Sequence, residues 1–277
     1  MRSTRSGQHA YVVAGVLLAL LLTVPASAHK PKDKASGRAD TLVGTTGPDV
    51  IDAKAGNDTV MTYEGDDLVK GQAGNDTVDA GADDDLVLLH AGDDLALGGP
   101  GRDRLLGHAG NDHLDGGDDA DGLVGMAGVD QLIGGTGDDD LQGAAGDDTL
   151  DGGDGDDHVS GGVGNDRIDA GLGADELDGG VGDDTLIDGP GDDKMTGDPG
   201  NDTIFLGSGY DEVNSEEGGD VVYVLLDGSV DNIYCGAGID RVYLVGGRDP
   251  LDTVGGAAPW LCETVEVIAT PPSGWPY

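Results

Sequence analysis

The sequence predicts an all-β repeat protein built from short, regularly spaced strands. Three observations lead to this fold class. A nine-residue pattern runs without insertion from residue 35 to residue 223, which makes 21 consecutive units. Glycine and aspartate dominate the composition, with 53 glycines and 48 aspartates in 277 residues. The second position of the unit also alternates in character from one unit to the next, which a nine-residue period alone does not produce.

The charge of the chain excludes several classes of protein. There are 55 acidic residues against 14 basic ones, and the formal net charge is −41. Such a polyanion repels phosphates, so nucleic acid is excluded as a partner. Aromatic residues make up 4% of the chain, which is too little for an ordinary large core. A disordered acidic tract is the alternative, but disorder gives no reason for a fixed phase of aspartates.

Residues 1–28 have the layout of a secretory signal peptide. Arg2 and Arg5 precede an apolar run over residues 11–24, and Ala26-Ser27-Ala28 forms a small-residue cleavage site. A membrane anchor is the alternative, but a span needs about 20 apolar residues. We therefore expect cleavage after Ala28, an extracellular protein and no membrane span in the mature chain. Residues 29–34 are interpreted as a flexible leader.

Two units show the repeat clearly. Residues 134–142 and 152–160 both fit the pattern G-G-x-G-x-D-x-U-x, in which U is aliphatic. The sixth position is aspartate and the eighth is aliphatic in all 21 units, and the fourth is glycine in 18 of them. Position eight is therefore expected to point inward and form a thin aliphatic core between two parallel sheets.

In these residues the chain resembles the hemolysin-type calcium-binding repeat family, the RTX nonapeptides. Residues 235–242 and 262–265 also resemble the end of the short exported repeat-only type of this family. The resemblance covers about residues 35–252. It implies a right-handed parallel β-roll with two nine-residue units per coil, in which positions one to six form a turn and seven to nine a short strand. It also implies calcium ions between stacked turns, held by carbonyls and position-six carboxylates. The expected metal ligands are Asp49, Asp58, Asp67, Asp76, Asp85, Asp94, Asp103, Asp112, Asp121, Asp130, Asp139, Asp148, Asp157, Asp166, Asp175, Asp184, Asp193, Asp202 and Asp211.

The chemistry of the turns agrees with calcium. Calcium takes six to eight oxygen ligands in flexible geometry, and glycine permits the positive φ values that aim turn carbonyls inward. Twenty-one units give 19 stacked pairs of turns, so 19 ions is the upper limit. Without calcium, repulsion between carboxylates and the small core should leave the chain largely unfolded. We therefore expect a secreted protein that folds when it binds multiple Ca²⁺ ions.

Residues 224–277 are interpreted as degenerate repeats and a C-terminal cap. Two extra residues, Val224 and Leu225, shift the frame, and three weaker units follow. Both cysteines and both tryptophans lie in this segment, and a solenoid needs its last coil covered. Cys235 and Cys262 are the only cysteines of an exported chain, so we expect a disulfide between them. Two free thiols are the alternative.

No catalytic motif is present in the sequence. There is no H-E-x-x-H motif, no G-x-S-x-G motif and no Walker loop, so the protein is predicted not to be an enzyme. Carboxylate pairs such as Asp138-Asp139 are interpreted as neighbouring acids of calcium turns. His90 and His108 lie two units apart and should stack; we interpret them as solvated imidazoles, with a transition-metal site as the alternative.

An apolar face suggests a second function. Leu88, Leu106 and Val124 occupy outward positions one coil apart and should form a stripe. The alternative hypothesis is therefore a calcium-stiffened adhesion or matrix component that self-associates or binds a cell-surface partner through this face of the rod.

Overall fold

The computed structural model describes residues 35–229, 231–245, 262, 264–268 and 276. In this part of the chain all regular structure is β-strand, and there is no helix of the length and apolarity that crossing a membrane requires. The predicted signal peptide and leader, residues 1–34, lie outside the described residues. So does much of the predicted cap, including residues 246–261.

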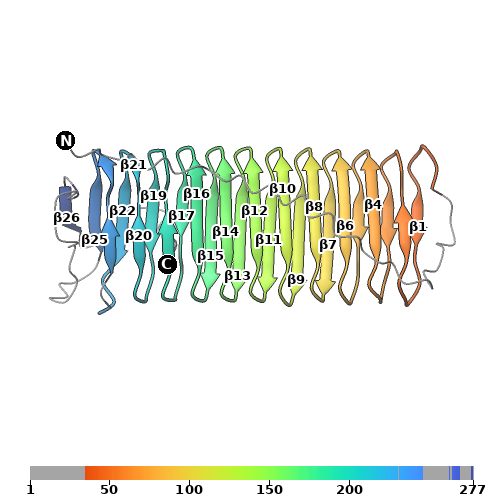
Figure 1. Cartoon of the computed structure of the whole chain (residues 1–277), viewed down its shortest axis with the longest axis horizontal. Helices are drawn as coiled ribbons and strands as arrows, with labels where there is room; N and C mark the ends of the chain where they lie inside the picture. The colour runs from red at the N-terminus through yellow and green to blue at the C-terminus, as the bar shows by residue number, and fades with distance from the viewer. Residues whose placement is uncertain (1–34, 230, 246–261, 263, 269–275, 277) are drawn as a thin grey trace, which may run out of the picture.

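The strands form two long parallel sheets that alternate along the chain (Figure 1). The 13-stranded sheet contains β1 (Thr41–Val43), β3 (Thr59–Met61), β5 (Thr77–Asp79), β7 (Leu95–Pro100), β9 (His113–Asp118), β11 (Gln131–Thr136), β13 (Thr149–Asp154), β15 (Arg167–Leu172), β17 (Thr185–Ile187), β19 (Thr203–Leu206), β22 (Val221–Leu225), β25 (Arg241–Val245) and β26 (Thr264–Ile268).

The second sheet has 11 strands. It contains β2 (Val50–Asp52), β4 (Leu68–Ala73), β6 (Leu86–Ala91), β8 (Arg104–Ala109), β10 (Gly122–Ala127), β12 (Asp140–Ala145), β14 (His158–Val163), β16 (Glu176–Val181), β18 (Lys194–Thr196), β20 (Glu212–Asn214) and β23 (Asn232–Tyr234). A separate two-stranded sheet pairs β21 (Glu217–Gly218) with β24 (Ala237–Gly238).

From β1 to β18, each strand pairs with the strand two places later, one coil along the chain. Leu105 pairs with Leu123, and Leu123 pairs with Leu141. This register confirms the predicted β-solenoid with two nine-residue units in each coil. Beyond residue 223 the step lengthens by two positions, since Val222 pairs with Val242. The two extra residues therefore shift the frame where the sequence indicated, while the ladder continues.

The strands of the central coils are longer than expected. The family resemblance implied strands at positions seven to nine, but β4 and β6 to β16 run six residues each, through position three of the next unit. Position two has a positive φ within these strands even where it is not glycine, for example 80° at His90 and 78° at His108. The ladder continues on both sides of this residue.

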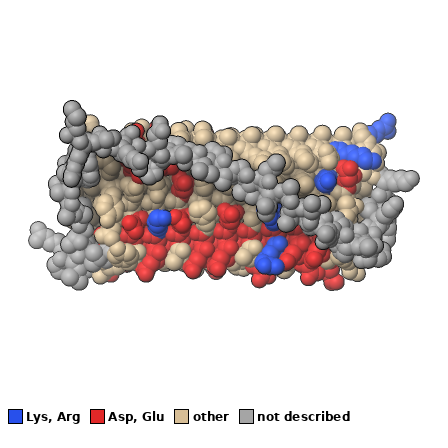
Figure 2. Space-filling model, viewed as in Figure 1, with Lys and Arg blue, Asp and Glu red and all other residues tan. Residues whose placement is uncertain are grey.

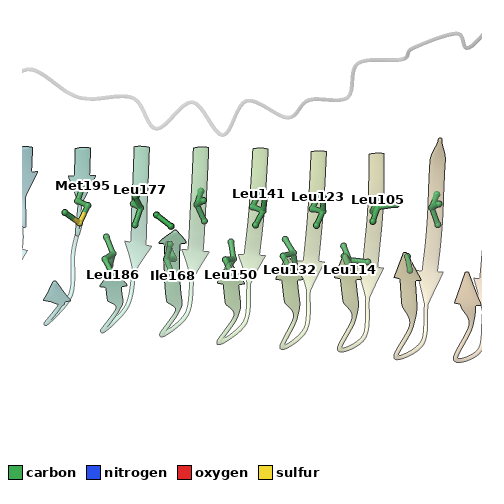
Figure 3. Close-up of a cluster of buried hydrophobic side chains, with 14 of the residues drawn as sticks. Leu105, Leu114, Leu123, Leu132, Leu141, Leu150, Ile168, Leu177, Leu186 and Met195 are labelled. Atoms are coloured by element: carbon green, nitrogen blue, oxygen red, sulfur yellow. The ribbon is translucent and has the colours of Figure 1, made fainter. Parts of the chain in front are cut away.

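The core is a narrow column between the two sheets. Alternation along each strand turns positions eight and one inward and positions seven and nine outward. The position-eight side chains are fully buried, and those of successive strands face one another across the gap (Figure 3). The sequence prediction of a thin aliphatic core is confirmed, and such a core leaves little apolar burial per residue.

Candidate metal sites

The sixth residue of each unit is an aspartate whose carboxylate lies inside the molecule. The same alternation that buries position eight also turns position six inward. From Asp49 to Asp220 these aspartates are at most 4% exposed. All 19 predicted ligands share this placement, and within each turn stack they follow one another at every second unit. The structure therefore gathers them into two rows along the rod.

From Asp58 onward, one oxygen of each carboxylate accepts a hydrogen bond from the preceding coil. The backbone N–H of Asp103 donates to Oδ1 of Asp121 at 2.7 Å, and that of Asp121 donates to Oδ1 of Asp139 at 2.7 Å. The same kind of bond recurs along both rows. The first donor of the series is the N–H of Asp40 and the last acceptor is Oδ1 of Asp240, and the donor–acceptor distances are 2.6–3.2 Å. We call this series the inner ladder.

The other oxygen of each carboxylate is buried without a hydrogen-bond partner. This holds for Oδ2 of all position-six aspartates from Asp58 to Asp220. At Asp49 it is Oδ1 that has no partner, because Oδ2 accepts the N–H of Thr45 at 2.6 Å. An uncompensated buried charge costs several kcal/mol, roughly, for each ion. Rows of such oxygens therefore require cations or protons.

Where position one is glycine, its missing side chain leaves space beside the unpartnered oxygen. A Cβ on Gly98 would lie 2.4 Å from Oδ2 of Asp103 and 2.6 Å from the carbonyl oxygen of Gly116. The same pair of atom types surrounds position one at Gly134, where the distances are 2.4 and 2.5 Å. A carboxylate and a carbonyl thus converge on one point, and oxygen donors of this kind are those that calcium prefers.

Burial raises the pKa of many position-six carboxyls. It raises the pKa of Asp85 and of Asp202 to about 8, against backbone hydrogen bonds that lower it. Carboxylates one coil away raise these pKa values further, as Asp103 and Asp67 do for Asp85. The interior thus disfavours negative charge, which a bound cation would relieve.

Comparison with protein-family models decides the family. A model of four copies of the RTX calcium-binding nonapeptide repeat matches residues 35–69, 61–96, 90–123, 97–132, 124–159, 133–168, 151–186, 178–213 and 187–222. These overlapping matches together span residues 35–222, more than half of the chain. The chain belongs to the RTX calcium-binding repeat family. It is therefore a calcium-binding repeat protein, and the position-six rows fit that chemistry. A comparison with curated proteins finds no match.

The RTX units carry a second ladder that the sequence analysis missed. Position-five side chains accept N–H groups from the following coil: Oδ1 of Asp138 accepts the N–H of Asp156 at 3.0 Å. The direction is opposite to that of the inner ladder. This outer ladder includes bonds at Asn57, Asn75, Asp84, Asp93, Asn111, Asp147, Asp156, Asn165, Asp183, Asp192 and Asn201, at 2.8–3.2 Å. The signal was the excess of Asp and Asn at position five.

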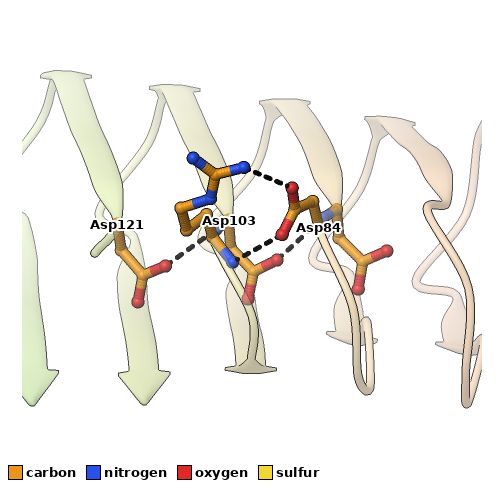
Figure 4. A network of polar contacts seen from close by, with 5 residues as sticks. Asp84, Asp103 and Asp121 are labelled. Atoms are coloured by element: carbon orange, nitrogen blue, oxygen red, sulfur yellow. Dashed lines mark hydrogen bonds and ion pairs between the residues drawn. The ribbon is translucent and has the colours of Figure 1, made fainter. Parts of the chain in front are cut away.

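The two ladders separate neighbouring acids into different roles. Asp138 is exposed, whereas Asp139 is 2% exposed. Figure 4 shows the same division around Asp84, Asp103 and Asp121. The backbone N–H and guanidinium of Arg102 bond Asp84 and lower its pKa. Acidic side chains also gather in a band along the face of the molecule in Figure 2.

The two predicted stacking histidines do stack. The rings of His90 and His108 lie 4.8 Å apart between centroids and are inclined by 7°. Burial, followed by the charge of His90, lowers the pKa of His108 and favours its neutral form. Among the residues that the structure describes, neither histidine belongs to a group of three metal-binding side chains.

Cys235 and Cys262 form the predicted disulfide, with their Cα atoms 5.3 Å apart. Cys235 follows β23 and is buried at the end of the core, and Cys262 packs against the same cluster from the segment before β26. The bond therefore fastens the last coils of the solenoid.

Proposed function

We propose that the chain is a secreted RTX-repeat protein that folds on binding multiple Ca²⁺ ions and has no catalytic activity. The observation that carries this proposal is the pair of rows of buried carboxylates, each with one oxygen that has no hydrogen-bond partner. A counter-ion in each turn would neutralise these rows. Calcium carries two positive charges and coordinates several oxygen ligands.

The ligands in this proposal are the position-six carboxylates from Asp49 to Asp211, together with carbonyls such as that of Gly116. When calcium is bound, it supplies the charge neutralisation that lets the rows stay buried. From Asp58 onward the aspartates hold the ion through Oδ2 while Oδ1 keeps the inner ladder intact, whereas at Asp49 the oxygen without a hydrogen-bond partner is Oδ1. Ion binding and coil stacking therefore use the same side chain, which couples binding to folding.

Export is the second part of the proposal, and it is supported by the sequence of residues 1–28. A calcium concentration near a millimolar outside the cell suits many weak sites. The absence of catalysis is supported by the lack of known catalytic motifs and by the repetitive use of the acids as buried structural groups.

Far-UV circular dichroism of residues 29–277 tests this function. The chain is titrated with calcium, and magnesium serves as the control. We expect a coil-to-β transition with calcium that magnesium does not produce, since magnesium demands six ligands at shorter distances. A β spectrum that is already complete in chelator at pH 8 would contradict the coupling of binding to folding.

A second candidate is an adhesion or matrix component that uses the apolar stripe. Leu88 pairs directly with Leu106, and Leu106 with Val124, so the three side chains lie side by side on the outer face of one sheet. They are partly exposed, and Leu97 and Met126, each 37% exposed, lie on the outside as well. Light scattering distinguishes the candidates, because calcium-dependent clustering supports a partner surface and a monomer at all calcium concentrations counts against it.

A further inference from the structure

One unit has an aspartate where the repeat has its inward first residue, usually glycine. Asp188 occupies position one of the unit that contains Asp193, and it is fully buried. Its Oδ1 accepts the N–H of Gly189 and the N–H of Gly207, each at 2.6 Å. These two backbone donors fix the carboxylate in the space that a position-one glycine leaves open in other units.

Asp188 thereby joins two carboxylates of the inner rows. One carboxylate oxygen from each of Asp188, Asp193 and Asp211 lies within 4.8 Å of the other two. Oδ1 of Asp193 and Oδ1 of Asp211 are engaged in the inner ladder, at 2.8 and 3.0 Å. Oδ2 of each is buried and has no hydrogen-bond partner. Among the described residues, this is the one group of three metal-binding side chains.

We propose that Asp188, Asp193 and Asp211 form a three-carboxylate calcium site that binds more tightly than the other turns. Calcium–oxygen distances of about 2.3–2.6 Å let two oxygens on one ion lie up to about 5 Å apart, which accommodates this group. Stacked turns elsewhere offer two position-six carboxylates, as Asp103 and Asp121 do. A third charge and a fixed geometry both raise calcium affinity.

The inference builds on the proposed function, because it concerns the same binding of calcium between stacked turns. It adds an order of filling: this site takes its ion first. It also places the first ion at β17 to β20, where the strands are short. An early ion there would join two successive turns of one stack before the remaining turns are neutralised.

Competition of the full mature chain with a calcium chelator of known affinity tests the site. Three variants are compared with the wild type. Asp188→Asn keeps the size and an oxygen acceptor, and Asp188→Gly restores the residue usual at position one. Asp192→Asn is the matched control, since Asp192 is exposed and its Oδ1 accepts only an outer-ladder N–H from Tyr210. Each variant loses one negative charge within the same unit.

We expect the wild type and Asp192→Asn to show one binding step about tenfold tighter than the rest, and both Asp188 variants to lose it. Loss of that step in Asp192→Asn as well, or its retention in both Asp188 variants, would overturn the assignment. The weaker steps report separately on the proposed function. If they persist while no tight step exists, only the three-carboxylate site is wrong; a wild type that binds no calcium overturns both.

Circular dichroism at saturating calcium shows whether each variant is folded. Asp188→Gly keeps the test valid if Asp188→Asn fails to fold, because glycine occupies this position in most central units. A folded Asp188→Gly protein with an unchanged tight step contradicts the proposal directly.

Discussion

The backbone N–H of Asp121 donates to Oδ1 of Asp139, which lies one coil further along the chain, at 2.7 Å. Oδ2 of the same Asp139 is buried and has no hydrogen-bond partner. One oxygen of this carboxylate thus accepts a structural hydrogen bond, and the other can serve as a ligand atom for a cation. This division explains why aspartate, with its short side chain, occupies position six in every unit.

Removing the charge of Asp139 should weaken calcium binding without breaking the inner ladder. Asp139→Asn keeps an oxygen that can accept the N–H of Asp121, but it is a poorer calcium ligand. We expect calcium-induced folding to need more calcium, and the chain to bind about one or two ions fewer. Calorimetric titration measures both quantities.

The neighbouring exposed acid is the control for this substitution. Asp138→Asn removes the same charge and keeps an acceptor for the N–H of Asp156. It should leave the ion count unchanged. Equal effects of the two variants would mean that overall charge, and not the buried oxygen, controls binding.

Acid should fold the calcium-free chain. Burial raises the folded-state pKa to about 6 for Asp67, Asp76, Asp103, Asp148 and Asp184, to about 7 for Asp112, Asp121, Asp157, Asp166, Asp193 and Asp211, and to about 8 for Asp85 and Asp202. Each group has an ordinary pKa near 3.8 when exposed, so between about 4 and 8 the folded state binds more protons. The folded state is therefore favoured as the pH falls through this window, and disfavoured above it.

Circular dichroism in chelator between pH 4 and pH 8.5 measures this effect. The β signal should rise as the pH falls, and more calcium should be needed at the lower pH because protons compete for the same oxygens. A calcium-free chain that loses β structure on acidification would show that the carboxylates are not buried in the uncharged form.

Gly110, at position four of its unit, should tolerate no side chain. A Cβ on Gly110 would lie 1.7 Å from the carbonyl oxygen of Gly92, and the φ of Gly110 is 132°. Gly110→Ala should lower the free energy of unfolding by more than about 2 kcal/mol, because the coils can no longer stack closely. Denaturant titration at saturating calcium gives the value.

Gly122 offers a matched site where alanine is harmless. It lies in β10, and the nearest atom to an added Cβ is the carbonyl oxygen of Asp103 at 3.9 Å. Gly122→Ala should be neutral or stabilise the strand by about 0.5–1 kcal/mol. Comparable losses in both variants would refute the argument from coil stacking.

The disulfide should contribute to the stability of the last coils. Cys235 and Cys262 are 27 residues apart, and closing such a loop contributes about 3.5 kcal/mol in the chain-entropy model. The double variant Cys235→Ser, Cys262→Ser should unfold at lower denaturant concentration at saturating calcium. Wild type treated with reductant should behave in the same way; unchanged stability in both would contradict a structural role.

Much of the fold follows from the periodicity. The constant phase of position six located the buried acids, and position eight located core residues such as Leu105 and Leu123. The alternation at position two marked the two-unit coil before any register was known. These features are predictable because one short repeat determines every local environment.

Other features depend on contacts between coils, which a single unit does not reveal. The positive φ of His108 carries no sequence signal, because only glycine marks such a conformation. The outer ladder needs the N–H of another coil. The inward placement of Asp188 beside Asp211 depends on two successive coils, so the pattern of one unit does not indicate a third carboxylate.

Anomalous diffraction from crystals of the calcium-loaded chain tests the central claim most directly. We expect calcium peaks at about 2.3–2.6 Å from Oδ2 of successive position-six aspartates, with turn carbonyls completing each site. Coils that stack through the inner ladder while Oδ2 of Asp103, Asp121 and Asp139 contact no ion would contradict calcium binding by the buried carboxylates.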